Sequence, residues 1–320
     1  MITQRAIEAI ESSDTDDLIR IIDGHCETSS WEDLIELRAR CREALTRGKQ
    51  LWGVEELIRY RLALEAPPKH AGPVVSEGVA RFALGPLGEV AASTKSWSDM
   101  EPFLDQGPER RTFAAERVVR GDTGTETLID LPGRLMEWEP SYPLATYKSD
   151  KVEAPSPASP KTEPVTLPSS AERVSDPESE GALADLVAPW AEQSNGHCET
   201  ATVEGSAKDA IRVLGLTRAR LVELPAPEAL RWMAWAGASG GAHGRRRGAA
   251  AGRYGTWWVL ASLADLDWPP DPEDVGKAAS RLSWYWFDDG GPGTGWQLRL
   301  AIEDPDEGLA WAIAAVDAAD

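Results

Sequence analysis

The stretch LSWYWFDDGGPGTGWQLRLAIE, residues 282–303, decides the fold class. Its arms, 282–289 and 295–303, are rich in aromatic and branched residues, and the GGPGT segment between them is typical of a turn. We therefore predict a β-hairpin. HCETATVE at 197–204 and RARLVEL at 218–224 also alternate between apolar and polar side chains, and both are predicted to be strands.

Helical patterns surround these strands. The predicted helices lie at 183–190, 206–214, 227–237, 249–266 and 272–279, with a last helix after Asp304-Pro305 that carries Leu309, Trp311, Ile313 and Val316. Helices interleaved with strands predict a C-terminal α/β layer domain over 181–320, built on a small mixed sheet.

Residues 1–120 show helical periodicity throughout. Asp14 is placed to cap a helix that Gly24 would end, and Ser30 is placed to cap a second helix that Gly48 would end. A third helix is expected from the stripe Val54, Leu57, Ile58 and Leu62, which Pro67-Pro68 ends. A fourth is expected from Pro73 around Val75, Val79 and Phe82, and a last one covers 109–120. Short amphipathic helices with short breaks favour an all-α array, either HEAT-like or an irregular bundle. The whole chain is thus expected to be α+β.

The region 121–180 separates the two predicted domains. Residues 121–147 keep some apolar side chains and are expected to drape over a folded surface. Residues 151–180 contain six prolines and six serines and little to bury. Such a composition cannot offset the entropy of ordering, so this range is predicted to be a disordered linker.

The chain of 320 residues has a formal charge of −20, from 33 basic and 53 acidic residues. A negative field of this size disfavours binding to nucleic acid and to anionic membrane surfaces. The three cysteines have no CxxC spacing, which favours a reducing compartment. The N-terminus lacks a signal-peptide pattern, and a cytoplasmic location is expected. No motif in the sequence indicates a bound cofactor.

The strongest candidate site is the stretch GASGGAHGRRRGAAAGR at 237–253. Glycines allow the backbone amides to form an anion-binding nest, a helix N-terminus follows, and arginine side chains bind phosphate or carboxylate with two hydrogen bonds. The predicted anion-binding residues are Gly240, Gly241, Gly244, Arg245, Arg246, Arg247 and Arg253.

Other interpretations of this loop stay open. It has neither the GxxxxGK[ST] pattern of a P-loop nor the dinucleotide fingerprint GxGxxG. Its arginines could instead pair with carboxylates of the same chain, or dock an acidic partner. His243 is the natural acid/base if the site is catalytic, but a histidine in a glycine-rich loop is also commonly just solvated.

The pentapeptide GHCET occurs at 24–28 and again at 196–200. Two His-Cys pairs raise the possibility of a zinc site. Adjacent residues of a strand point to opposite faces, however, so His197 and Cys198 are poorly placed to share an ion. We interpret the repeat as a coincidence and predict no metal site.

Two other clusters have ordinary explanations. The carboxylates around the hairpin (Asp288, Asp289, Glu303, Asp304, Asp306 and Glu307) could hold Mg²⁺ or Ca²⁺, but turn and capping chemistry accounts for them. The aromatic residues Trp257, Trp258, Trp284, Tyr285 and Trp286 could stack on a ligand, but such positions are more typical of a core.

Two functional hypotheses follow. The first is a non-catalytic protein-interaction or scaffold protein whose helical domain binds a protein partner, because helical arrays present extended surfaces. The second is an enzyme or ligand-binding module that takes a phosphorylated or carboxylated small molecule at 237–253.

Overall fold

The computed structural model describes residues 3–78, 80–81, 83–123, 130–291, 293 and 295–318. The chain forms two compact units. Unit 1 comprises Met1–Leu128 and Ala145–Glu153, and unit 2 comprises Ile129–Leu144 and Ala154–Asp320. Helices dominate unit 1 and a sheet with helices forms unit 2, so the α+β prediction is confirmed. No helix in the described ranges is long and apolar enough to cross a bilayer.

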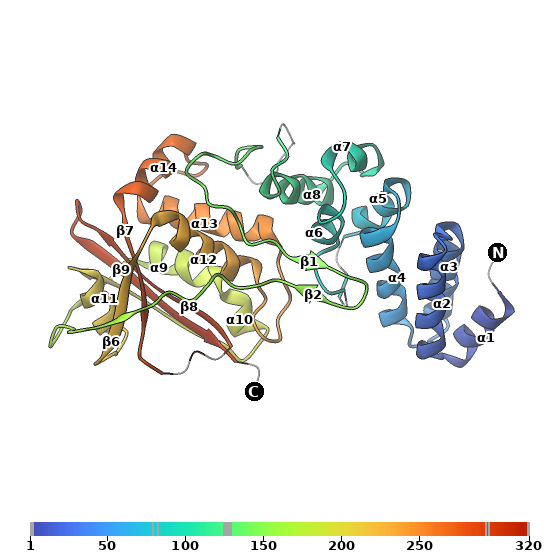
Figure 1. The fold of residues 1–320 in the computed structure, drawn as a ribbon, viewed down its shortest axis with the longest axis horizontal. Helices are drawn as coiled ribbons and strands as arrows, with labels where there is room; N and C mark the ends of the chain where they lie inside the picture. The colour runs from blue at the N-terminus through green and yellow to red at the C-terminus, as the bar shows by residue number, and fades with distance from the viewer. Residues whose placement is uncertain are drawn as a thin grey trace. The chain divides into compact units, whose positions relative to one another are not determined.

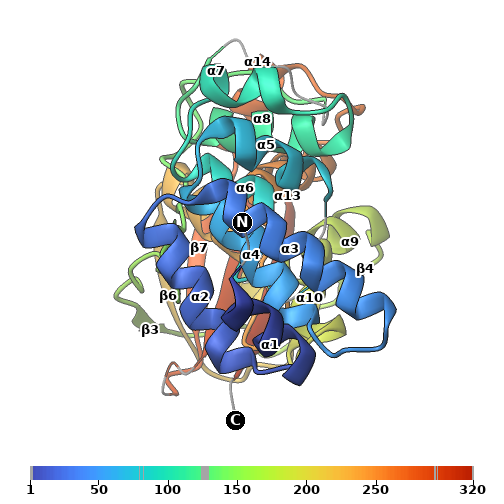
Figure 2. The same ribbon diagram turned by 90° about the vertical axis from the view of Figure 1, so that its right-hand side faces the viewer.

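Unit 1 is built mainly from helices. They are α1 (Gln4–Ser12), α2 (Thr15–Glu27), α3 (Trp31–Thr46), α4 (Trp52–Glu65), α5 (Pro68–Ser76), α6 (Leu87–Ala92), α7 (Trp97–Met100), the 3₁₀ helix η1 (Glu101–Phe103) and α8 (Pro108–Val119). From α1 to α5 each helix packs on the next one along the chain, and α2, α3 and α4 lie side by side in both views (Figures 1 and 2).

The predicted helix ends in unit 1 are only partly right. The Asp14 side chain accepts the Asp17 N–H at 2.9 Å, as predicted for a cap, but α2 continues past Gly24 to Glu27. Gly48 follows α3 with a φ of 86°, where a glycine is favoured. The fourth helix begins at Pro68 rather than at Pro73. The expected Val79 and Phe82 lie outside the described residues.

A short hairpin completes unit 1. Its strands are β1 (Thr146–Tyr147) and β2 (Val152–Glu153), which pair antiparallel. The Tyr147 hydroxyl donates to Glu89 Oε2 at 2.6 Å, and the Tyr60 hydroxyl donates to the Lys148 carbonyl. The side chain of Glu89 is fully buried, so this hydrogen bond ties the hairpin to the interior of the unit.

The sheet of unit 2 has seven strands in the order β3-β6-β7-β8-β9-β5-β4. They are β3 (Glu163–Val165), β4 (Arg173–Val174), β5 (His197–Glu204), β6 (Ala219–Leu224), β7 (Ser283–Asp288), β8 (Trp296–Asp304) and β9 (Leu309–Asp317). The predicted hairpin is confirmed, with Trp284 opposite Ile302. The strand pairs of the described sheet are antiparallel, so the predicted mixed sheet is wrong.

The last predicted helix is also wrong, because Leu309–Asp317 is the strand β9 between β8 and β5. Trp311 and Ile313 point to one face of the sheet, and Ala310 and Ala312 point to the other. Alanine favours helix, which misled the prediction. β9 pairs with a strand on each side, and large side chains alternate with alanines along it. These two features outweigh the helix preference of alanine.

The range 151–180, predicted to be a disordered linker, contains β2, β3, β4 and the start of a helix in the structure. β3 pairs with β6 and β4 pairs with β5, at the two edges of the sheet. Edge strands of two or three residues are held by backbone hydrogen bonds and need few apolar side chains, so composition does not reveal them. Pro164 in β3 is tolerated because an edge strand need not donate on both sides.

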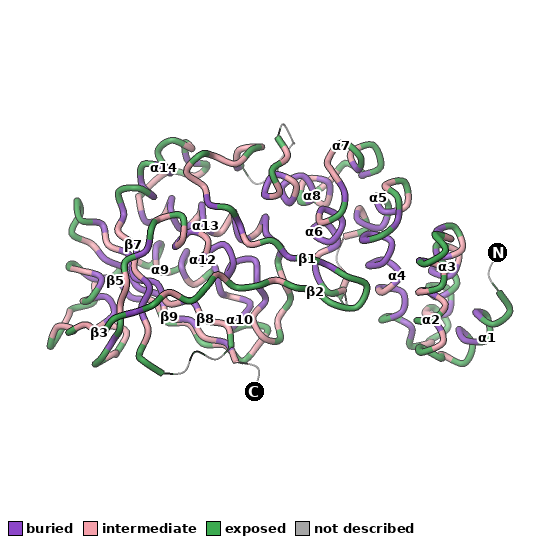
Figure 3. The backbone as a smooth tube through the Cα atoms, in the orientation of Figure 1, coloured by how far each residue is buried: buried purple, intermediate pink, exposed green. Residues whose placement is uncertain are grey.

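Helices cover both faces of the sheet, as Figures 1 and 3 show. They are α9 (Pro177–Leu186), α10 (Ala188–Glu192), α11 (Ala207–Val213), α12 (Ala226–Ala238), α13 (Ala249–Leu263) and α14 (Pro272–Arg281). One face carries Leu298, Leu300 and Ile302 and packs with α9, α12 and α13 in the larger core. The other face is lined by alanines and packs on α11.

Candidate functional site

The glycine-rich loop between α12 and α13 binds a carboxylate of its own chain. The Ala242 N–H donates to Asp317 Oδ2 at 2.6 Å, and Asp317 is 1% exposed. The Ser194 hydroxyl donates to Asp317 Oδ1 at 3.0 Å and accepts the His243 N–H at 3.2 Å. The loop therefore uses a backbone amide for an anion, as its composition suggests, and that anion is the last residue of β9.

Close approach explains two of the glycines. Gly241 has a φ of 75°, and a Cβ there would lie 2.0 Å from Asp317 Oδ2. A Cβ on Gly244 would lie 2.2 Å from the Gly240 carbonyl oxygen. Both distances are far too short for a side chain, so these glycines are required for loop closure and for the contact with Asp317.

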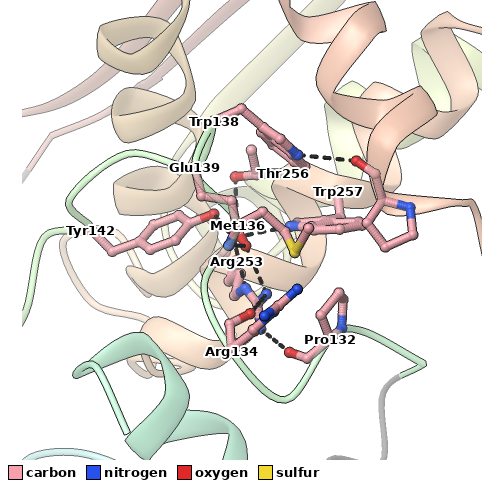
Figure 4. Close-up of polar contacts among 11 residues, drawn as sticks. Pro132, Arg134, Met136, Trp138, Glu139, Tyr142, Arg253, Thr256 and Trp257 are labelled. Atoms are coloured by element: carbon pink, nitrogen blue, oxygen red, sulfur yellow. Dashed lines mark hydrogen bonds and ion pairs between the residues drawn. The ribbon is translucent and has the colours of Figure 1, made fainter. Parts of the chain in front are cut away.

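Arg253 is not at the surface of the loop but inside unit 2 (Figure 4). Its side chain is 1% exposed, and its partner Glu139 is fully buried. The Nε atom donates to Glu139 Oε2 at 2.7 Å and Nη2 donates to Oε1 at 2.8 Å. Two backbone carbonyls, of Pro132 and Arg134, accept further hydrogen bonds at 3.0 Å each. The predicted ligand-binding arginine thus holds the segment 132–139 of its own chain.

Three other donors meet the same carboxylate. The Tyr142 hydroxyl and the Trp257 Nε1–H donate to Glu139 Oε2 at 2.6 and 3.1 Å, and the Met136 N–H donates to Oε1 at 2.9 Å. Burial acts to raise the pKa of Glu139, but the hydrogen bonds and charge of Arg253 outweigh it, so this pKa is lowered. Burial raises the pKa of Tyr142, which stays a hydrogen-bond donor.

The remaining predicted residues of the loop lie closer to solvent. Arg245 and His243 are exposed, and Arg246 is half-buried. Arg247 is exposed, its Nη1 donates to the Asp185 carbonyl at 3.0 Å, and it lines a cavity of about 440 Å³. The predicted set is thus divided between an internal cluster and separate surface positions.

A second arginine-rich region lies in unit 1 and escaped the sequence analysis. Four arginines (Arg38, Arg42, Arg59 and Arg81) and three glutamates (Glu55, Glu56 and Glu77) line a groove of about 680 Å³, with Trp52 at its side. The groove therefore carries a local charge of +1 in a chain of net charge −20. The i,i+4 spacings of Arg38 with Arg42 and of Glu55 with Arg59 are the sequence signal that could have indicated it.

One carboxylate organises the arginines of this groove. The Arg38 Nη1 donates to Glu77 Oε1 at 2.7 Å, while its Nε donates to Glu55 at 2.7 Å. Arg59 and Arg42 lie 3.8 and 4.0 Å from Glu77 Oε2. The hydrogen bonds from Arg38 lower the pKa of Glu77 more than burial raises it, so Glu77 is ionised near neutral pH.

The rim of the groove is open to solvent. The side chain of Arg42 is 61% exposed and makes no hydrogen bond to any described residue. Arg81 is exposed and has no ion-pair partner within the described ranges. Trp52 is 55% exposed, the largest exposure among the large apolar residues of the described chain. Two available cations beside an exposed indole can bind a carboxylate that has an apolar neighbour.

The two GHCET copies differ in structure. His25 and Cys26 lie in α2 of unit 1, whereas His197 and Cys198 lie in β5 of unit 2. Burial raises the pKa of Cys26 to about 12 and that of Cys198 to about 11, so both thiols are protonated near neutral pH. In the described residues no group of three or more His, Cys, Asp or Glu side chains is placed to hold a metal ion.

The carboxylates around the hairpin serve turns and caps. Asp288 and Asp289 accept the N–H groups of Gly290 and Gly291 at 2.8 and 2.9 Å. Asp304 accepts Arg281 Nη2 at 2.6 Å, and Glu303 accepts the Ala207 N–H at 3.1 Å.

The tryptophans discussed above are mostly core residues. Trp257, Trp284 and Trp286 are between 0% and 5% exposed, which supports the interpretation as core. Trp258 and Tyr285 are half-buried.

Comparison with known proteins gives a family and nothing more specific. No curated protein and no solved structure is detectably similar to this chain. The model of DUF6183, a family of unknown function, matches residues 16–319 and so includes both units. The chain therefore belongs to the DUF6183 family.

Proposed function

We propose that this protein is a non-catalytic interaction protein whose helical unit binds an acidic segment of a partner protein. The binding surface is the groove of unit 1 described above, which we call the arginine groove. One observation carries the proposal: Arg42 and Arg81 present their guanidinium groups at an open groove of about 680 Å³ with no hydrogen bond to any other described residue.

The arginines of the groove already bind one carboxylate of the same chain. Glu77 is bound by Arg38 and approached by Arg59 and Arg42. A glutamate or aspartate of a partner that enters beside Glu77 meets Arg42 and Arg81, the two cations that internal hydrogen bonds leave available. Charge-assisted hydrogen bonds of this kind are among the stronger polar contacts at interfaces.

Trp52 defines the second requirement of the partner. An indole that is 55% exposed beside charged residues is typical of a binding anchor, since Trp and Arg dominate the energetics of interfaces. The favoured segment therefore has acidic residues next to an aromatic or aliphatic residue. The charge of −20 on the whole chain opposes an acidic partner at long range, but at physiological salt that field is screened beyond about 8 Å.

The test uses fluorescence anisotropy with the full chain and two labelled peptides. One peptide contains Glu and Asp residues around a single Phe, and the other replaces each acid by its amide. We expect the acidic peptide to bind at least about tenfold more tightly, which corresponds to about 1.4 kcal/mol. The double variant Arg42→Gln/Arg81→Gln should lose this preference, and Trp52→Ala should weaken binding of both peptides.

The matched control is Arg20→Gln/Arg40→Gln, which removes two exposed positive charges on α2 and α3 outside the groove. This variant should bind the acidic peptide like the wild type. Equal binding of the two peptides, or equal weakening by the control pair, would sink the proposal.

The alternative is a site for a phosphorylated or carboxylated small molecule at 237–253. Its exposed cations are Arg245 and Arg247, because Arg253 is bound to Glu139. The favourable observation is that Arg247 lines a cavity. A thermal-shift titration with phosphosugars, comparing the wild type with Arg245→Ala/Arg247→Ala, tests it. Stabilisation of the wild type alone would support this alternative.

A further inference from the structure

We propose that the cavity beside α9, α10 and α13 binds a small molecule that carries a guanidinium group at one end and a carboxylate at the other. The cavity has a volume of about 440 Å³ and lies wholly within unit 2. This volume is within the range of small-molecule sites and matches an amino acid or a similar metabolite. The proposal does not rest on the arginine groove of unit 1.

The cavity is hollow because small residues form part of its lining. Two of these small residues are Ala182 and Ala188, where larger side chains would reduce the space. A Cβ on Gly255 would lie 2.9 Å from Leu186 Cδ2, so α9 and α13 pack closely at this point. The packing of α9 on α13 therefore sets part of the lining.

Two carboxylates provide the negative charge. Asp185 at the end of α9 and Glu192 at the end of α10 both line the cavity. Neither side chain makes a hydrogen bond or an ion pair of 4.0 Å or less with a residue in the described ranges, and both lie near enough to Arg247 for the charges to interact. Two carboxylates against one arginine leave the cavity with a net negative charge, which is suited to an incoming cation.

Two aromatic residues line the same cavity. Tyr254 and Trp258 lie one helical turn apart on α13 and are half-buried. Each is held edge-on by Trp268, with ring centroids 5.2 Å apart in both pairs. A cation over such rings is stabilised by the ring quadrupole, most strongly where water is displaced. Acidic groups beside aromatic faces thus favour an organic cation over an inorganic ion.

Arg247 supplies the opposite charge at the same cavity. Its Nη1 donates to the Asp185 carbonyl at 3.0 Å, which leaves other N–H groups of the guanidinium for a ligand. A carboxylate of the ligand can pair with Arg247 while the cationic group lies at Asp185, Glu192 and the two rings. The combination selects a zwitterion rather than a simple cation or anion.

Isothermal titration calorimetry of the full chain with three probes tests this assignment. L-arginine carries a guanidinium and a carboxylate, L-citrulline keeps the α-ammonium and carboxylate but replaces the guanidinium by a neutral ureido group of similar shape, and agmatine lacks the carboxylate. We expect L-arginine to bind at least about tenfold more tightly than either analogue, the size of effect that one lost charged contact produces.

Variants separate the two charge contacts. Asp185→Asn/Glu192→Gln should remove the preference for L-arginine over L-citrulline, whereas Arg247→Gln should remove the preference over agmatine. The matched controls, Glu172→Gln/Glu204→Gln and Arg245→Gln, change the same charges outside the cavity and should keep both preferences. Thermal melting confirms that each variant is folded.

Every outcome bears on the assignment. No heat of binding from L-arginine, equal affinity for L-arginine and L-citrulline, or preferences that survive in the cavity variants would each overturn it. A failure here leaves the peptide-binding proposal for unit 1 untouched, since the two sites share no residue.

Discussion

The arginines of unit 1 and those of unit 2 are used in opposite ways. In unit 2, glycines and arginines are concentrated in the stretch 237–253. Nevertheless, Arg253 is bound to Glu139 and the Ala242 amide is bound to Asp317 of the same chain. In unit 1, no run of sequence stands out, yet arginines from separate helices line an open groove. A concentration of glycines and arginines in the sequence therefore does not indicate that the arginine side chains are free to bind a ligand.

The difference has a simple physical origin. An acidic chain contains many carboxylates, and a buried guanidinium must have one because an unpaired buried charge is strongly unfavourable. The groove of unit 1 is only partly closed, so water can solvate Arg42 and Arg81 and neither needs a hydrogen-bonded carboxylate of its own chain. The predictions below test this contrast between filled and open sites.

The largest expected effect is loss of the buried pair in unit 2. Arg253→Met leaves the Glu139 carboxylate buried without its ion-pair partner and should lower the free energy of unfolding of unit 2 by about 3 to 5 kcal/mol. Urea denaturation followed by tryptophan fluorescence measures this, since ten of the fourteen tryptophans follow residue 180. The double variant Arg253→Met/Glu139→Met should recover part of the loss. A change below about 1 kcal/mol for Arg253→Met would contradict the account.

The same pair makes a pH prediction. The pKa of Glu139 is lowered in the folded state, so the unfolded state binds its proton first as the pH falls. The stabilisation by Glu139 is therefore present above its unfolded pKa of 4.5 and is lost as the pH falls through the lower folded pKa. The stability difference between wild type and Glu139→Gln should shrink below pH 4.5, and a constant difference would argue against the ion pair.

A buried cation that forms no ion pair with a described carboxylate gives the next effect, in unit 1. The Lys95 ammonium donates to the carbonyls of Ala63 and Leu64, at 2.8 Å each, at the end of α4. Burial lowers the pKa of Lys95 from 10.5 to about 8, against the charge of Glu65, which raises it. Between these two pH values the unfolded state binds more protons, so stability rises with pH.

We expect the wild type to gain up to about 3 kcal/mol relative to Lys95→Met between pH 8 and pH 10.5. Urea denaturation followed by the methyl NMR signals of Leu64 reports on unit 1. A stability difference that stays flat over this range would show that Lys95 keeps its ordinary pKa.

The smallest of these stability effects concerns the glycine loop. Gly241→Ala places a Cβ against Asp317 Oδ2 at a positive φ and should destabilise unit 2 by about 2 kcal/mol. Gly181 is the matched control, because it lies in α9 where an added Cβ meets nothing within 4 Å. Gly181→Ala should stabilise unit 2 by about 0.5 to 1 kcal/mol. Equal effects of the two substitutions would show that the contact with Asp317 is unimportant.

Local signals predicted much of the fold. The Asp14 cap and the 282–303 hairpin are found as expected, because each depends on neighbours in sequence. β9 was mistaken for a helix because its strand state depends on pairing with β8 and β5. The edge strands β3 and β4 were missed because backbone pairing leaves little trace in composition.

The candidate sites were harder to predict for the same reason. The sequence of 237–253 indicates that it binds anions. It does not identify the internal partners Glu139 and Asp317, because these residues are distant in sequence. The arginine groove combines residues from α3 and α4 with Glu77 and Arg81, so only the folded chain brings them together.

The contrast between the two regions can be tested directly by NMR of the arginine side chains. Titration of ¹⁵N-labelled protein with the acidic peptide should shift the Nε–Hε signals of Arg42 and Arg81, while the signal of Arg253 stays unchanged. Shifts confined to Arg245 and Arg247, with Arg42 and Arg81 unaffected, would contradict the assignment of the open anion site to the helical unit.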